Sequence, residues 1–199
     1  MFAILFVCTA NVCRSPVAEQ IFVKAIKLAD PNHAWRVQSA GVWADRGRGS
    51  PSRLVRAAAK KSVDLQSHRS QNVEQLDLTK IDLILTMEAG QCEALRAEFP
   101  GLAMRIHQLS ALAGPRYDIA DPYGGSEQEY LYMIDELSLL INKALPRIVE
   151  MAEKVHEETT QTMAPAAKST DDVSDSRHRP SARADGTHRP IFEPCLSGS

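Results

Sequence analysis

The sequence predicts an α/β fold: a small, doubly wound sheet of four parallel strands with helices on both of its faces. Short apolar runs alternate along the chain with longer segments whose apolar residues recur at helical spacing, and this alternation favours parallel strands joined by helical crossovers. The chain has 199 residues and is 44% hydrophobic, which is sufficient for one substantial core.

Two strands and two helices are expected in the first half of the chain. Residues 3–8 are continuously apolar, as in a strand that is buried on both faces. A helix over residues 16–29 ends at Asp30-Pro31, since a residue before proline disfavours the helical conformation. A second strand over residues 36–39 precedes a loop rich in Gly and Arg and a helix over residues 52–61. The inward face of the first helix is predicted from four apolar residues, Val17, Ile21, Ala25 and Leu28.

The second half repeats the pattern. A strand over residues 83–87 leads into a helix over residues 89–99, which Pro100-Gly101 closes, and a short strand follows over residues 104–108. A long helix begins near Ser126, and proline within it predicts either a kink or its last turns. Its apolar stripe consists of Tyr130, Met133, Leu137, Leu140, Ile141, Ala144 and Ile148.

Composition divides the chain into a domain over residues 1–155 and a tail over residues 156–199. The tail is rich in Ser, Thr, Asp, Arg and Pro and lacks periodic apolar residues, so it is predicted to be a disordered polar segment. The net charge of −2 gives no support for nucleic-acid binding.

Apolar stretches and cysteines bear on location. The longest apolar stretches are interrupted within about ten residues, which is too short for a membrane span, and no secretion signal precedes the first strand. The four cysteines do not have the pattern of a secreted disulfide framework, so a cytoplasmic location is expected.

The segment from Cys8 to Ser15 is suited to binding a phosphate dianion. A loop between a strand end and a helix start presents backbone N–H groups next to the positive end of the helix dipole, and the fork of Arg14 grips two phosphate oxygens. The same field favours the nucleophilic thiolate of Cys8. A buried strand cysteine near a surface arginine is the alternative, but Ser15 as N-cap and Pro16 at the first helical position favour the loop. The phosphate-binding residues are Thr9, Ala10, Asn11, Val12, Cys13, Arg14 and Ser15.

Residues 7–16, followed by Ala18-Glu19, resemble the signature of the low-molecular-weight protein tyrosine phosphatases. Asp121-Pro122-Tyr123 lies where that family has its general acid. Smaller matches follow the same order: Ser39-Ala40-Gly41, Asp64-Leu65 with His68-Arg69-Ser70, and residues 82–88. The similarity covers about residues 1–153. It is greatest to the bacterial members that accompany capsule or exopolysaccharide tyrosine kinases.

The resemblance implies hydrolysis of phosphotyrosine through a phosphocysteine formed on Cys8, with Arg14 stabilising the transferred group. Asp121 would protonate the leaving phenol and then deprotonate the attacking water. Without the resemblance, Asp121-Pro122 is equally typical of a surface turn. No metal and no cofactor are implied. The implied partner is a phosphotyrosine protein, such as a bacterial tyrosine autokinase, and the oligomeric state is undefined.

Further residues acquire roles through the resemblance. Asn11, Ser39 and His68 would hold the loop in shape, and Ser15 would donate to the Cys8 sulfur as well as capping the helix. Cys13 has two alternative roles: it forms a reversible disulfide with Cys8, or it packs beneath the loop.

Tyr123 and Trp43 are the candidate walls of a slot deep enough for a phosphotyrosine ring. Trp43 lies four residues past Ser39, whereas the eukaryotic members carry their wall aromatic further along that loop, so core packing is its alternative role.

The sequence is less consistent with three other functions and with a metal site. The resemblance extends to the protein-arginine phosphatases, which share the scaffold, but their loop has Thr where this chain has Val12. An arsenate reductase needs a further cysteine pair, and Cys92 stands alone in mid-chain. A non-catalytic phosphate-binding module would need a defect in the site. A thiol metal site is disfavoured because Cys8 and Cys13 lack the usual Cys-x2-Cys spacing.

Overall fold

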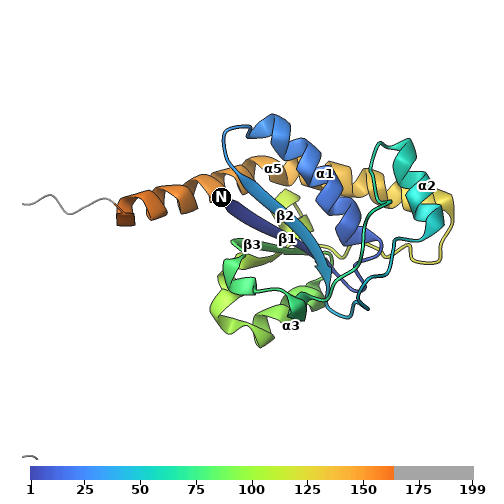
Figure 1. Ribbon diagram of the computed structural model, residues 1–199, viewed down its shortest axis with the longest axis horizontal. Helices are drawn as coiled ribbons and strands as arrows, with labels where there is room; N and C mark the ends of the chain where they lie inside the picture. Colours follow the sequence, from blue (N-terminus) through green and yellow to red (C-terminus); the bar gives the residue numbers. More distant parts are fainter. Residues whose placement is uncertain (164–199) are drawn as a thin grey trace, which may run out of the picture. The chain divides into compact units, whose positions relative to one another are not determined.

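The computed structural model describes residues 1–163, with side chains through Val155. Four strands form one parallel sheet in the order β2-β1-β3-β4 (Figure 1), which confirms the predicted fold class. They are β1 (Phe2–Cys8), β2 (Trp35–Gly41), β3 (Leu83–Thr86) and β4 (Ile106–Gln108). The chain adds β2 to one side of β1 and then returns to add β3 on the other side. The carboxyl end of β1 is therefore a switch point, where sheets of this kind bind ligands.

Helices cover both faces of the sheet. Figure 1 shows α1 (Arg14–Ala29) and α5 (Glu127–Met163) on one side and α3 (Ala89–Glu98) on the other. The first side also holds α2 (Ser52–Lys60) and α4 (Leu109–Ala113), which pack against α5. Short 3-10 helices, not predicted from the sequence, span Val73–Gln75, Leu78–Lys80 and Pro100–Arg105.

The side chains of β1 alternate between two cores. Phe2, Ile4, Phe6 and Cys8 pack with α1, α2 and α5, while the intervening residues of β1 pack with α3 and the 3-10 helices. Every residue of β1 is buried, as expected for a central strand of a doubly covered sheet. This burial fixes the register of β1 and so the position of the loop that follows it.

Two features of α1 differ from the prediction. The helix begins at Arg14 rather than at residue 16, and its N-cap residue is Cys13, without a side-chain capping bond. Leu28, predicted on the inward face, is 87% exposed. Phe22 and Ile26 are buried, and Leu28 lies about 200° around the helix from Ile26, at 100° per residue.

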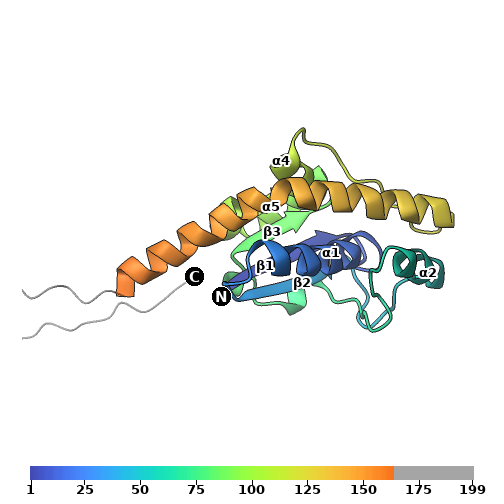
Figure 2. The ribbon, with the colours of Figure 1, turned by 90° about the horizontal axis from the view of Figure 1, so that it is seen from above.

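The long helix α5 continues through Pro146 to Met163. Its predicted apolar stripe is buried throughout. Pro146 itself is exposed, so water can reach the carbonyl group that loses its amide partner there. Ala144 and Ile148 anchor the helix on either side of the proline. The ribbon changes direction along its length (Figure 2), as expected for a proline kink.

The helix α5 includes residues 156–163, although their composition predicted that they belong to the tail. The predicted disorder of residues 164–199 lies outside the described residues. In the part of the chain that the structure describes, no helix is both long enough and apolar enough to cross a membrane.

Candidate active site

The loop over residues 9–13 leaves β1 at the switch point and enters α1 at Arg14. It packs directly against Gly41 at the end of β2, which pairs with Cys8. A Cβ atom on Gly41 would lie 2.6 Å from the carbonyl oxygen of Thr9 and 2.8 Å from the amide nitrogen of Asn11. Both contacts are closer than real Cβ contacts, so only glycine permits this packing.

Replacing Gly41 with alanine should therefore displace the loop backbone. We expect a loss of about 1–3 kcal/mol in the free energy of unfolding, the usual cost of overpacking, together with at least tenfold weaker binding of inorganic phosphate. Thermal unfolding and calorimetric phosphate titration measure the two effects. Gly101→Ala is the matched control, because no atom outside its chain neighbours and its own helix lies within 4 Å of its Cβ position. Unchanged stability and binding in Gly41→Ala would show that the loop is not held by this contact.

Asn11 is the central residue of the hydrogen bonds inside the loop. Its backbone is left-handed, with φ 53°, a conformation that Asn tolerates better than most residues. Its Nδ2 donates to the hydroxyl oxygens of Ser15 and Ser39, each at 2.9 Å. Its Oδ1 accepts from the Gln71 amide at 2.9 Å. The Nε2 of His68 donates to the Asn11 carbonyl oxygen at 2.7 Å. The structure thus brings together Asn11, Ser39 and His68, the three residues predicted to shape the loop, and adds Ser15 to them.

Two neighbours of this network were not predicted. Gln71 contributes its amide and also donates from Nε2 to the carbonyl oxygen of Ser39 at 2.9 Å. Glu19 accepts from the Ser39 hydroxyl at 2.6 Å, and burial raises the pKa of this carboxyl group. Glu19 lies within the family signature, but its contact with Ser39 could not be predicted from the sequence, because that contact forms only once α1 lies across β2.

Cys8 is 3% exposed, and its Sγ lies 3.0 Å from the hydroxyl oxygen of Ser15. Ser15 also lies 3.2 Å from the Ala40 carbonyl oxygen. The predicted N-cap role of Ser15 is wrong: it is the second residue of α1, and Cys13 occupies the cap position. The hydroxyl is instead directed at Cys8 and Ala40, where its hydrogen can be donated to a thiolate.

Arg14 is almost fully buried, with 1% exposure, and its guanidinium is held by several acceptors. Nη1 donates to Glu88 Oε1 at 2.5 Å and to the Ile119 carbonyl oxygen at 2.8 Å. Nη2 donates to Asp121 Oδ2 at 2.7 Å and to Thr9 Oγ1 at 3.3 Å. Nε is buried and has no hydrogen-bond partner among the described residues. A buried donor of this kind has the chemistry of an anion ligand.

Glu88 was not predicted as a site residue, although it lies in the matched run over residues 82–88. It is the N-cap of α3 and forms a capping box with Gln91. Gln91 Nε2 also donates to Thr9 Oγ1 at 3.1 Å. The start of α3 therefore supports both Arg14 and the phosphate loop.

Asp121 approaches the loop from a segment that follows α4. One oxygen pairs with Arg14, while Oδ1 accepts from the Tyr123 amide at 3.1 Å. Asp121 therefore forms a turn with Tyr123 and, at the same time, places its carboxylate at the guanidinium of Arg14. Asp118 anchors the segment, since its Oδ1 accepts from the Ala89 amide at 2.7 Å.

The candidate wall residues lie at the rim. Tyr123 is 57% exposed, and its hydroxyl lies 3.1 Å from Arg48 Nη2. Trp43 is 80% exposed, so the core-packing alternative is wrong. Its amide donates to the Thr9 carbonyl oxygen at 2.9 Å, which holds its backbone against the loop.

Cys13, the last residue of the loop, is buried, with 2% exposure, and it and Cys8 are both free thiols. Burial, followed by the charges of Asp121 and Cys8, raises the pKa of Cys13 to about 12. Cys13 is therefore a thiol at neutral pH, as the packing interpretation expects. Within residues whose side chains the structure describes, no group of three or more His, Cys, Asp or Glu residues could hold a metal ion.

Comparison with known proteins gives consistent results. Residues 3–161 match the family model of the low molecular weight phosphotyrosine protein phosphatases. The chain is 36% identical over 140 residues to the low molecular weight protein-tyrosine-phosphatase PtpB of Staphylococcus aureus, covering 70% of this chain and 94% of that protein. It is 32% identical over 141 residues to the protein-arginine-phosphatase of Bacillus subtilis, covering 70% and 92%.

Solved structures show the same fold. The low molecular weight protein tyrosine phosphatase from T. tengcongensis superimposes with a TM-score of 0.68 at 34% identity, covering 74% of this chain and 99% of that one. The tyrosine phosphatase Wzb from Escherichia coli K30, in complex with sulphate, superimposes with a TM-score of 0.65 at 25% identity, covering 74% and 99%.

Proposed function

Because the chain belongs to the low molecular weight phosphotyrosine protein phosphatase family, we propose that it hydrolyses phosphotyrosine on proteins and that Cys8 is the nucleophile. The observation that supports this most is Arg14. Its guanidinium is buried next to Thr9 of the loop and fixed by Glu88, and its Nε has no hydrogen-bond partner among the described residues. A phosphate dianion held there would lie over the loop amides at the start of α1.

In the proposed first step, the Cys8 thiolate attacks phosphorus in line with the bond to the phenolic oxygen. The sulfur–phosphorus bond forms as the phosphorus–oxygen bond breaks, and Asp121 gives its proton to the leaving phenol. The loop amides and Arg14 stabilise the charge on the equatorial oxygens. The hydroxyl of Ser15, 3.0 Å from the sulfur, stabilises the thiolate.

In the second step, water attacks the phosphocysteine and gives a proton to the Asp121 carboxylate. Cys8 leaves as a thiolate and inorganic phosphate is released, so the protein returns to its starting state. Neither step consumes an oxidant or a reductant. The hydrogen bonds of Asn11 with Ser15 and Ser39 keep the loop in one shape through both steps, which limits reorganisation.

The experiment that tests this function compares four substrates under one condition. With a chelator present, phosphotyrosine peptides should be hydrolysed at least about a hundredfold faster than matched phosphoserine or phosphoarginine peptides, because a long, flat ring reaches a thiolate at the floor of a slot. A small aryl phosphate serves as the reference. Faster hydrolysis of phosphoarginine would identify an arginine phosphatase, and hydrolysis of none of them would identify a binding module.

Val12 favours phosphotyrosine over phosphoarginine as the substrate, because the loop of the arginine phosphatases has Thr at this position. It is 2% exposed and packs in the larger core. An apolar group there offers no hydrogen-bond acceptor to a guanidinium.

The physiological substrate that we propose is a bacterial tyrosine autokinase of exopolysaccharide production. The support is the similarity of residues 83–88 to the members that accompany such kinases, together with the fold shared with Wzb. Such a role places the protein in the cytoplasm, where free thiols such as Cys8 and Cys13 persist.

A further inference from the structure

A groove of about 380 Å³ lies beside the phosphate loop, between the segment that follows β2 and the helix α3. Thr9 belongs to both, because it is a loop residue and also lines the groove. Its hydroxyl accepts from Arg14 and Gln91, so the groove begins where the phosphate site ends. The residues that characterise it are Thr9, Trp43, Val73, Glu74, Leu95 and Glu98.

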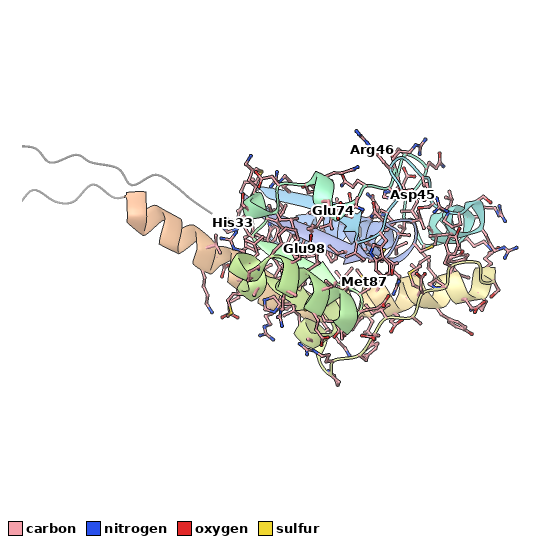
Figure 3. The ribbon with its side chains drawn as sticks, turned by 90° about the horizontal axis from the view of Figure 1, so that it is seen from below. His33, Asp45, Arg46, Glu74, Met87 and Glu98 are labelled. Carbon is pink, nitrogen blue, oxygen red and sulfur yellow. The ribbon has the colours of Figure 1, made fainter. Side chains whose placement is uncertain are left out.

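The groove has an apolar floor and an acidic rim. Val73 and Leu95 are buried, at 3% and 1% exposure, whereas Trp43 is 80% exposed. Glu74 and Glu98 are exposed and lie on the face seen in Figure 3, one after β2 in sequence and one at the end of α3. Neither carboxylate has a hydrogen bond or ion pair with the residues whose side chains the structure describes.

We propose that this groove binds a lysine or arginine side chain that lies close to the phosphotyrosine in the protein substrate. The inference rests on the proposed function and specifies its substrate: phosphotyrosine with a basic neighbour. Continuity with the phosphate loop supports it, since a peptide whose phosphotyrosine enters the loop passes the mouth of the groove.

The chemistry of the groove fits a basic side chain better than an acidic or aliphatic one. Lys and Arg combine an apolar stem with a charged end, which matches an apolar floor and an acidic rim. Two unpaired carboxylates attract the cation and repel an acidic residue. The exposed ring of Trp43 offers its face to the same cation. Glu88 also lines the groove, but its carboxylate is already paired with Arg14.

The test measures kcat/KM for phosphotyrosine peptides that differ at one position. Lys, Gln and Glu are placed in turn at each of the three positions before and after the phosphotyrosine. We expect one position at which Lys exceeds Glu by about fivefold to tenfold, the size given by exposed ion pairs and a cation–π contact. The ratio should fall as salt is added, because exposed charges are screened.

Variants then locate the effect. In the double variant Glu74→Gln, Glu98→Gln the Lys-to-Glu ratio should fall close to one, and Trp43→Ala should reduce it by a smaller factor. Glu93→Gln is the matched control, because Glu93 is an exposed carboxylate on the same helix that does not line the groove. Its ratio should equal that of the unmodified protein.

The outcomes separate this inference from the function on which it rests. Hydrolysis of the Gln peptides with equal rates for Lys and Glu at every position would overturn the groove and leave the phosphatase proposal intact. A preference for Lys that survives in the double variant would also overturn it. Failure to hydrolyse any phosphotyrosine peptide would instead overturn the proposed function.

Discussion

Cys8→Ser is expected to lower turnover of an aryl phosphate by about a thousandfold or more, as loss of a covalent nucleophile does in other enzymes. A serine hydroxyl at this position remains protonated at neutral pH and has no adjacent base. Binding of inorganic phosphate should persist, because Arg14 and the loop amides are unchanged. Steady-state kinetics and calorimetric titration measure the two properties on the same protein sample.

Two comparisons make this result specific. Cys92→Ser replaces another buried free thiol, on α3, and should leave turnover close to that of the unmodified protein. Arg14→Ala should lose both phosphate binding and turnover, since it removes the charge that holds the dianion. Substantial turnover by Cys8→Ser, without an added nucleophile, would exclude the covalent mechanism.

Asp121→Asn should produce a loss that depends on the leaving group. A tyrosine phenolate, whose conjugate acid has a pKa near ~10, needs a proton in order to leave, whereas a nitrophenolate departs without one. We expect phosphorylation of Cys8 by phosphotyrosine to slow by about a hundredfold or more, the usual contribution of a general acid. With nitrophenyl phosphate the same step should slow by less than about tenfold.

Rapid quench is the suitable measurement, because slow hydrolysis of the phosphocysteine would hide the first step in steady-state rates. Asn is the suitable replacement, because its amide oxygen can still accept one of the two bonds that Asp121 receives from Arg14 and the Tyr123 amide. An equal loss on both substrates in the first step would make Asp121 a structural turn residue.

The sequence predicted those parts of the site that are contiguous in the chain. Cys8 ends β1 and Arg14 begins α1, so one short loop joins them, as their spacing predicted. That both face one anion stays a prediction. Glu88 could not be predicted in this way, since its contact with Arg14 spans 74 positions and depends on β3 lying beside β1. The sequence predicts the sheet, but it does not predict that the Glu88 side chain, which follows β3, is directed at Arg14.

The errors have similar physical causes. Serine is a preferred N-cap residue, and this local preference alone led to the prediction that Ser15 caps α1. In the folded protein its hydroxyl contacts Cys8 and Ala40, and α1 begins at Arg14, two residues earlier than predicted. Leu28 follows helical spacing from Val17, but Phe22 and Ile26 define the buried face. Spacing within a helix therefore predicts an amphipathic face only when all of the buried residues are considered together.

The pairing of Arg14 with Asp121 has a consequence for product inhibition. Before substrate arrives, one oxygen of Asp121 occupies Nη2 of the guanidinium, so an incoming dianion competes with an anion that belongs to the protein. In the proposed mechanism Asp121 holds a proton when inorganic phosphate departs, and once it has lost that proton its carboxylate pairs with Arg14 again. Phosphate that rebinds must then displace an anion of the protein itself, so inorganic phosphate should inhibit the enzyme only weakly.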